Sequence, residues 1–219
     1  MESREHNKKI YEFKEEEIDN ILKSYICISK KLYEDNNIKY IQIFKNYKRE
    51  GGASLVHPHS QIVALNIIPE KINNILSYSK HFYENNHKCL YCNIISEELK
   101  YNKRLIYEND KFICFCPGTS TFSYEITIMK KDHKAFLNFN FEDITPLSQC
   151  IVKITDKIYS KLGDIALNIC LYFIKEENEY FHFTIGIYPR ISSFAGFEIS
   201  TGIIQNPISP EKAAKKLKI

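Results

Sequence analysis

The chain has 219 residues, of which 44% are apolar, and a net charge of +3. It is long enough to bury a core without disulfides, and its small charge gives no reason to expect nucleic-acid or membrane binding. Residues 1–6 are charged and the longest apolar run, residues 165–174, is too short to cross a bilayer, so we expect no signal peptide and no membrane span. Seven cysteines without a secretion signal favour reduced thiols, metal binding and a cytoplasmic location.

The first part of the chain predicts two helices and two strands. Apolar residues at helical spacing predict a helix over residues 15–35. Residues 40–44 read as a strand that leads into a glycine turn at residues 51–54. The apolar run 62–68 predicts a buried strand. Pro69 then opens a helix that extends to about residue 86.

The second part begins with Cys89-Leu90-Tyr91-Cys92 and a short helix through Leu99. Alternating apolar segments predict an antiparallel meander, followed by a long helix over residues 144–162 that ends at Gly163. The further strands are expected at residues 166–174, 180–188 and 199–204, and the meander at residues 105–108, 112–116 and 124–129. A last helix is expected over residues 210–218.

This order of elements fits an α+β fold with antiparallel sheets and helices laid on one face. The succession of helix, strand, turn and strand occurs at residues 15–68 and again at 141–188, which suggests two related halves. We therefore divide the chain into a first half, residues 1–87, and a second half, residues 88–219.

The motif His57-Pro58-His59-Ser60-Gln61 carries the clearest chemical signal. In an extended segment, His57, His59 and Gln61 share one face. The preceding turn, Gly51-Gly52-Ala53-Ser54, has little side-chain bulk, so a phosphate can approach its backbone N–H groups. The competing interpretation is an ordinary surface strand, which is the more common setting of an isolated His-x-His.

His59 is the candidate nucleophile of this motif. A neutral imidazole can attack phosphorus and form a phosphoramidate, provided that its second nitrogen is held as a donor. Gln61 is expected to hydrogen-bond a phosphate oxygen as charge develops there, and Ser60 to do likewise. The alternative for Gln61 is a solvated strand residue without a catalytic role.

The pair Cys89 and Cys92 predicts a metal site. Two thiolates at this spacing and two imidazoles complete a tetrahedral zinc site, and His133 and His182 lie in the same half as the pair. His81 and His87 are alternatives, but they lie on or beyond a helix end and are expected to be exposed. The other interpretation is a free thiol pair or a redox motif, for which a thioredoxin-like βαβ setting is lacking.

These residues also carry a family resemblance. Residues 44–61 resemble the active-site segment of galactose-1-phosphate uridylyltransferases, which are members of the histidine triad superfamily. Residues 188–214, from Tyr188-Pro189-Arg190 to Ala213-Ala214, resemble the C-terminal segment of the same family. The resemblance extends from about Glu5 to Leu217.

The resemblance implies roles for individual residues. His59 would be uridylylated in a ping-pong reaction, Gln61 would stabilise the intermediate, and Ser60 would lie near the phosphates. The residues near the substrate would be Asn46, Gly52, Ser54, Phe194, Gly196 and Glu198. His6 and His57 would be ligands of a first zinc site, and the second zinc of the family would be held by Cys89, Cys92, His133 and His182.

The chain also departs from the family pattern. Family members carry a further N-terminal region whose Cys-x-x-Cys completes the first zinc site and which contacts uridine. We therefore expect a truncated member with an incomplete first half. Where many relatives read His-x-His-x-Glu, this chain reads His182-Phe183-Thr184-Ile185-Gly186, so we expect neither a second nucleophile nor an iron site.

Three functions are compatible with this pattern. The first is a UDP-glucose–hexose-1-phosphate uridylyltransferase that acts through a nucleotidyl-histidine in galactose metabolism. The second is a nucleotide-sugar or dinucleoside-polyphosphate phosphorylase, and the third is a catalytically silent zinc-stabilised binding domain. The expected partners are a nucleotide sugar, a hexose 1-phosphate and a second copy of the chain in a homodimer.

Overall fold

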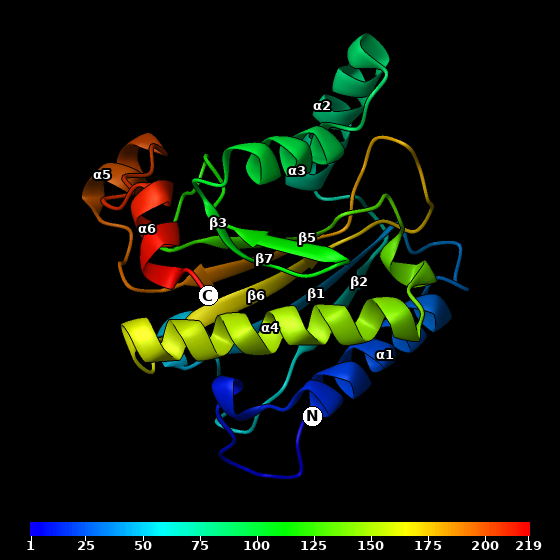
Figure 1. Cartoon of the computed structure of the whole chain (residues 1–219). Coiled ribbons are helices and arrows are strands. Elements are labelled where there is room, and N and C mark those ends of the chain that lie inside the picture. Colours follow the sequence, from blue (N-terminus) through cyan, green and yellow to red (C-terminus); the bar gives the residue numbers. More distant parts are fainter.

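The computed structural model describes all 219 residues and contains one seven-stranded sheet, in which every pair of neighbouring strands is antiparallel (Figure 1). The strand order is β2-β1-β6-β7-β5-β4-β3. The bounds are β1 Tyr40–Tyr47, β2 Gln61–Leu65, β3 Leu105–Glu108, β4 Phe112–Phe115, β5 Ile126–Lys130, β6 Leu167–Tyr172 and β7 Thr184–Pro189. The predicted α+β class and the antiparallel meander of β3, β4 and β5 are confirmed.

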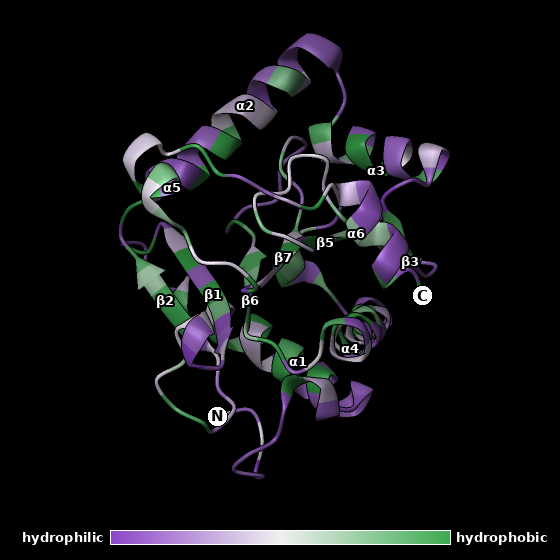
Figure 2. Ribbon diagram, turned by 90° about the vertical axis from the view of Figure 1, so that its left-hand side faces the viewer, coloured by the Kyte–Doolittle hydropathy of each residue, from purple (hydrophilic) through white to green (hydrophobic).

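The helices lie on both sides of this sheet. Figures 1 and 2 both show α1 and α4 on one side of the strands and α2 and α3 on the other. The bounds are α1 Glu15–Leu32, α2 Glu70–Asn86, α3 Leu90–Tyr101, α4 Phe141–Leu162, α5 Gly196–Thr201 and α6 Pro210–Leu217. Short 3₁₀ turns lie at Ile10–Glu12, Arg49–Gly51 and Phe136–Asn138. No helix combines the length and apolar character that crossing a bilayer requires.

Alternation along the strands explains why both faces are covered. On β4, Phe112 and Cys114 belong to the large core that includes α1 and α4, whereas Ile113 packs with Ile95 of α3. Successive side chains of a strand point to opposite faces, so a strand that is apolar throughout needs cover on both sides. Helices were expected on one face of the sheet. α1 and α4 do lie on one face, but α3 covers the opposite face.

The centre of the sheet is the pairing of β1 with β6. Residues from Ile43 to Tyr47 pair with residues from Leu167 to Leu171. On either side of this pair, α1-β1-β2 and α4-β6-β7 repeat the same succession of elements. Strands from both sides of residue 87 thus belong to one continuous sheet, and the division into residues 1–87 and 88–219 stays a prediction.

Two predicted strands are wrong in part. The apolar run 62–68 predicts a buried strand, but β2 ends at Leu65 and lies at the edge of the sheet, where Val63 is 40% exposed. Ile67, beyond the end of β2, is 63% exposed. Residues 199–204 were expected to form a strand, but α5 occupies Gly196–Thr201 and ends at Gly202, whose φ of +71° is the left-handed conformation. The Glu198 carboxylate accepts a hydrogen bond from the Ala195 N–H at 3.0 Å, which favours the helical turn.

The core of α4 yields a stability prediction. Leu147 is fully buried against the sheet, so Leu147→Ala should lower the free energy of unfolding by about 2–5 kcal/mol. Chemical denaturation would measure this change. The matched control is Ile28→Ala on α1, where the side chain is 44% exposed and the loss should stay below about 1 kcal/mol. Equal losses in the two variants would contradict this description of the core.

Candidate functional site

His59 lines a cavity of about 590 Å³ at the end of β1. The walls come from residues 7–10, 45–50 and 53–59. Five cationic side chains are among the lining residues, namely Lys8, Lys9, Lys45, Lys48 and Arg49. Four of them are paired with carboxylates: Lys8 with Glu5 and Glu17, Lys9 and Lys48 with Asp164, and Lys45 with Glu2. Arg49 has no carboxylate partner, so it is the cation of this lining that is available to a polyanionic ligand such as a diphosphate. These cations belong to no recognisable motif, although Lys8-Lys9 and Lys48-Arg49 are visible in the sequence as basic pairs.

The ring of His59 is held in one orientation. Its Nδ1 lies 2.9 Å from the carbonyl oxygen of His57. A carbonyl can only accept, so Nδ1 carries the proton and the Nε2 lone pair is free. This is the arrangement that a nucleophilic imidazole requires.

The ring of His57 is fixed from two sides. Its Nε2 donates to the Ser3 carbonyl at 2.9 Å, and its Nδ1 lies 2.7 Å from Nδ1 of His6. Two imidazole nitrogens on one tetrahedral ion would lie about 3.3 Å apart, so the spacing is that of an N–H···N hydrogen bond from His6 to His57. The roles of His6 and His57 as ligands stay predictions.

The glycine turn packs closely against the centre of the sheet. Gly52 has a φ of +87°, which favours glycine, and a Cβ on Gly51 would lie 3.0 Å from the carbonyl oxygen of Leu167. The side-chain amide of Asn168 donates to Gly51 O at 2.6 Å and to Asn46 Oδ1 at 2.8 Å. Asn168 thereby joins β6 to both the turn and Asn46, a role that its sequence context did not reveal.

The other residues of the motif point elsewhere. Ser60 hydrogen-bonds the Glu2 carboxylate and the Tyr25 hydroxyl, and it is not part of the cavity lining. Gln61 is exposed on the edge strand β2 and is not part of the lining either. The contacts of Ser60 and Gln61 with phosphate stay predictions, because neither residue lines the cavity of His59.

The predicted substrate-binding residues fall into two groups. Asn46 and Ser54 line the cavity of His59, and Gly52 packs beside Asn46, whose amide would lie 3.5 Å from a Cβ at this position. Phe194 contacts Phe122, with ring centroids 5.7 Å apart. Gly196 and Glu198 belong to the start of α5, and like Phe194 they are absent from the cavity lining.

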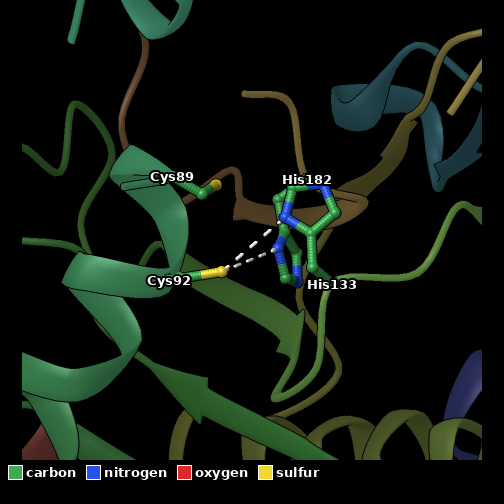
Figure 3. A group of neighbouring side chains, drawn as sticks. All are labelled: Cys89, Cys92, His133 and His182. Atoms are coloured by element: carbon green, nitrogen blue, oxygen red, sulfur yellow. Dashed lines mark hydrogen bonds between the residues drawn. The ribbon is translucent and has the colours of Figure 1, made fainter. Parts of the chain in front are cut away.

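The four residues predicted to bind zinc converge on one point. The candidate ligand atoms of Cys89, Cys92, His133 and His182 all lie within 4.8 Å of one another. Figure 3 shows the two thiols on the helix facing the two imidazoles, and Cys92 Sγ lies 3.7 Å from His133 Nδ1 and 3.8 Å from His182 Nδ1. Ordinary zinc bond lengths in a tetrahedron place sulfur and nitrogen about 3.5 Å apart.

Both imidazoles are turned so that Nδ1 is available to an ion. Nε2 of His133 donates to the Asn178 carbonyl at 2.5 Å, and Nε2 of His182 donates to the Lys130 carbonyl at 2.6 Å. Backbone carbonyls commonly hold metal-binding histidines in this way. The hydrogen bond between the two thiols lowers the pKa of the Cys89 thiol and raises that of the Cys92 thiol, so Cys89 is the thiolate of the pair.

These residues fit a structural zinc ion, which would join three separate segments. Cys89 and Cys92 open α3, His133 follows β5, and His182 lies just before β7 rather than within a strand as expected. The Cys pair does open a helix, as redox motifs do, but α2 precedes it in place of a strand. With all four tetrahedral positions supplied by the protein, a zinc ion here would have no open position for a substrate.

Comparison with known proteins places the chain in a family. Residues 11–218 match the family described as Domain of unknown function (DUF4921). ADP-glucose phosphorylase of Arabidopsis thaliana is 31% identical over 208 residues, which are 92% of this chain and 58% of that protein. Galactose-1-phosphate uridylyltransferase of Thermotoga maritima is 28% identical over 98% of this chain and 70% of that protein. The chain belongs to the DUF4921 family and to the wider galactose-1-phosphate uridylyltransferase family.

Solved structures of this family share the fold. The Arabidopsis thaliana ADP-glucose phosphorylase with bound ADP-glucose has a TM-score of 0.91 and 30% identity, covering 99% of this chain and 71% of that one. A uridylyltransferase structure superimposes with a TM-score of 0.93 at 24% identity, over 99% of this chain and 72% of that one. The chain spans about 58% of the length of the phosphorylase sequence, so activity, substrates and partners are matters of proposal.

The metal site yields a second prediction. Cys89→Ser should remove about one equivalent of zinc from the purified protein and lower the thermal midpoint by about 6–12 °C, the shift expected for about 3 kcal/mol in a chain of this size. Elemental analysis and calorimetry would measure both. Cys27→Ser is the matched control, because Cys27 is exposed and outside the cluster. Retention of full zinc content by Cys89→Ser would contradict the assignment.

Proposed function

We propose that this protein transfers a nucleotidyl group between phosphates through a covalent intermediate on His59. The observation that carries the proposal is the free Nε2 of His59 in a cavity lined by five cationic side chains. The named relatives are a phosphorylase and uridylyltransferases, which support a nucleotidyl transfer of this kind. The proposed substrates are a nucleotide sugar and a second phosphate.

The chemistry balances without an external acid or base. The Nε2 lone pair of His59 forms a bond to the α-phosphorus, and the bond from that phosphorus to the bridging oxygen breaks. Hexose 1-phosphate leaves with the electron pair of that bond. The ring then carries positive charge with Nδ1–H retained, and the His57 carbonyl accepts the hydrogen bond from that proton. Attack by a second phosphate returns the electron pair to Nε2 and releases the nucleotide product.

Two acceptors distinguish the related functions. A hexose 1-phosphate acceptor would make the protein a hexose-1-phosphate uridylyltransferase of galactose metabolism. Inorganic phosphate would make it a phosphorylase, as the name of the Arabidopsis relative indicates for that protein. The cations of the cavity favour a phosphate group in either acceptor and do not favour one over the other.

The His59 intermediate can be tested directly. Incubation of the protein with labelled UDP-glucose or ADP-glucose should give a nucleotidyl adduct on His59, located by peptide mass spectrometry. His59→Ala should lower its formation at least about 10³-fold. His81→Ala, a change of the same side chain on the exposed surface of α2, should leave it unchanged. A chase of the adduct with hexose 1-phosphate or inorganic phosphate then identifies the acceptor.

Absence of an adduct with both nucleotide sugars would favour the alternative of a silent zinc-stabilised domain. In that case the metal content and the fold would be unaffected by His59→Ala, and the protein would bind nucleotides without turnover. An adduct that forms equally in wild type and His59→Ala would place the nucleophile elsewhere.

We further propose that two copies associate. Large apolar side chains are exposed along residues 191–204, where Ile199 is 77% exposed and Ile203 is 60% exposed. Apolar surface of this extent is often covered by a partner. Sedimentation velocity should find a dimer for the wild type and a monomer for Ile199→Lys/Ile203→Lys. Tyr78→Lys on α2, which is also highly exposed, is the control. A monomeric wild type would refute this proposal.

A further inference from the structure

A buried polar cluster lies directly behind the His57–Ser60 segment. Its centre is the Glu2 carboxylate, whose side chain is 7% exposed. Glu2 forms an ion pair with Lys45 and accepts hydrogen bonds from Tyr25 and Ser60. Burial alone would raise the pKa of the Glu2 carboxyl, but the Lys45 ammonium and the hydrogen bonds from Ser60 and Tyr25 hold this pKa below its usual range.

Residues of this cluster contact the backbone of the motif at two points and its side chains at two more. The Glu2 N–H donates to the Pro58 carbonyl at 3.0 Å, and the Lys45 ammonium donates to the His59 carbonyl at 3.5 Å. The Ser3 carbonyl accepts from His57, as described above. Each residue from His57 to Ser60 therefore has a contact to residues 2–3 or to Lys45.

These contacts matter because the tautomer of His59 depends on main-chain geometry. The bond from His59 Nδ1 to the carbonyl two residues earlier exists only while the backbone at residues 57–59 keeps its present shape. Residues 57–60 precede β2, which begins at Gln61, and belong to no helix or strand, so the sheet does not impose that shape. The main chain of Glu2 and Ser3, together with the side chains of Glu2 and Lys45, supplies the constraint.

We propose that Glu2 is a positioning residue for His59, and that Ser60 belongs to this buried cluster. Glu2 acts through Lys45 and Ser60 to keep the backbone of the motif in place, which keeps Nδ1 protonated and aims Nε2 into the cavity. The role of Glu2 in catalysis rests on the function proposed above, whereas its role in orienting the imidazole does not.

Glu2→Gln is the informative substitution, because it keeps the size of the side chain and removes the charge that pairs with Lys45. In the full chain, we expect the single-turnover rate of adduct formation from a nucleotide sugar to fall about 10-fold to 100-fold. The dissociation constant for that nucleotide sugar should rise less than about threefold, since Glu2 does not line the cavity of His59 and the substitution leaves the cavity-lining Lys45 ammonium without its carboxylate partner. If Glu2 had only a structural role, Glu2→Gln would both lower the rate of adduct formation and raise the dissociation constant.

The orientation of the ring can be read without any activity. In ¹⁵N spectra of protein with labelled histidine, His59 should show the Nδ1–H tautomer in the wild type and a mixture of tautomers in Glu2→Gln. His59→Ala identifies the signal. Glu16→Gln, the same chemical change at an exposed position of α1, should alter neither the spectrum nor the rate. Tyr25→Phe removes one donor to Glu2 and gives a milder form of the same effect if Glu2→Gln does not fold.

The outcomes separate the two proposals. Adduct formation by the wild type, with a slower rate and a mixed tautomer in Glu2→Gln, supports the positioning role. A folded Glu2→Gln protein with unchanged rate and unchanged tautomer overturns it. If the wild type forms no adduct, the proposed function fails, and the ¹⁵N spectra of Glu2→Gln still decide whether Glu2 orients His59.

Discussion

The pairing of β1 with β6 is the contact on which the remaining structure depends. It joins the α1-β1-β2 unit to the α4-β6-β7 unit in one sheet, and it places Asn168 of β6 beside the end of β1. Asn168 then fixes both Asn46 and the glycine turn, whose close packing on β6 leaves no room for a side chain at Gly51. The cavity of His59 opens beside this turn, so its shape follows from a strand pairing made 122 residues further along the chain.

Backbone carbonyls direct the histidines at both sites, in opposite senses. At His59 the carbonyl of His57 holds Nδ1, and Nε2 is left for chemistry. At His133 and His182 the carbonyls of Asn178 and Lys130 hold Nε2, and Nδ1 is left for a metal ion. A neutral imidazole has one donor and one acceptor nitrogen, so the carbonyl that binds one nitrogen decides what the other can do. The same residue type thus suits two different proposed roles, a nucleophile at His59 and a zinc ligand at His133 and His182.

Local patterns predicted most of the elements because helical spacing and strand alternation are properties of short segments. The predicted helices and the meander are of this kind, and so is the Cys89–Cys92 pair. The helices are α1, α2, α3, α4 and α6. Two strands were misjudged for a reason beyond the segment itself. An apolar run such as 62–68 reads as buried, and only the strand order reveals an edge. Residues 199–204 contain three isoleucines, which favour a strand, but Glu198 and Gly202 favour a helical turn at Gly196–Thr201 and its end.

The sequence by itself determined the family, the nucleophile hypothesis for His59 and the choice of His133 and His182 as partners of the cysteines, because motif spacing and residue chemistry suffice for these. Only the tertiary structure decided which groups surround the motif. Ser60 was expected to face phosphate and instead contacts Glu2, and the cations at the cavity come from two separate stretches of chain. Such contacts join residues as much as 58 positions apart, and no local pattern encodes which side chain meets which across that distance.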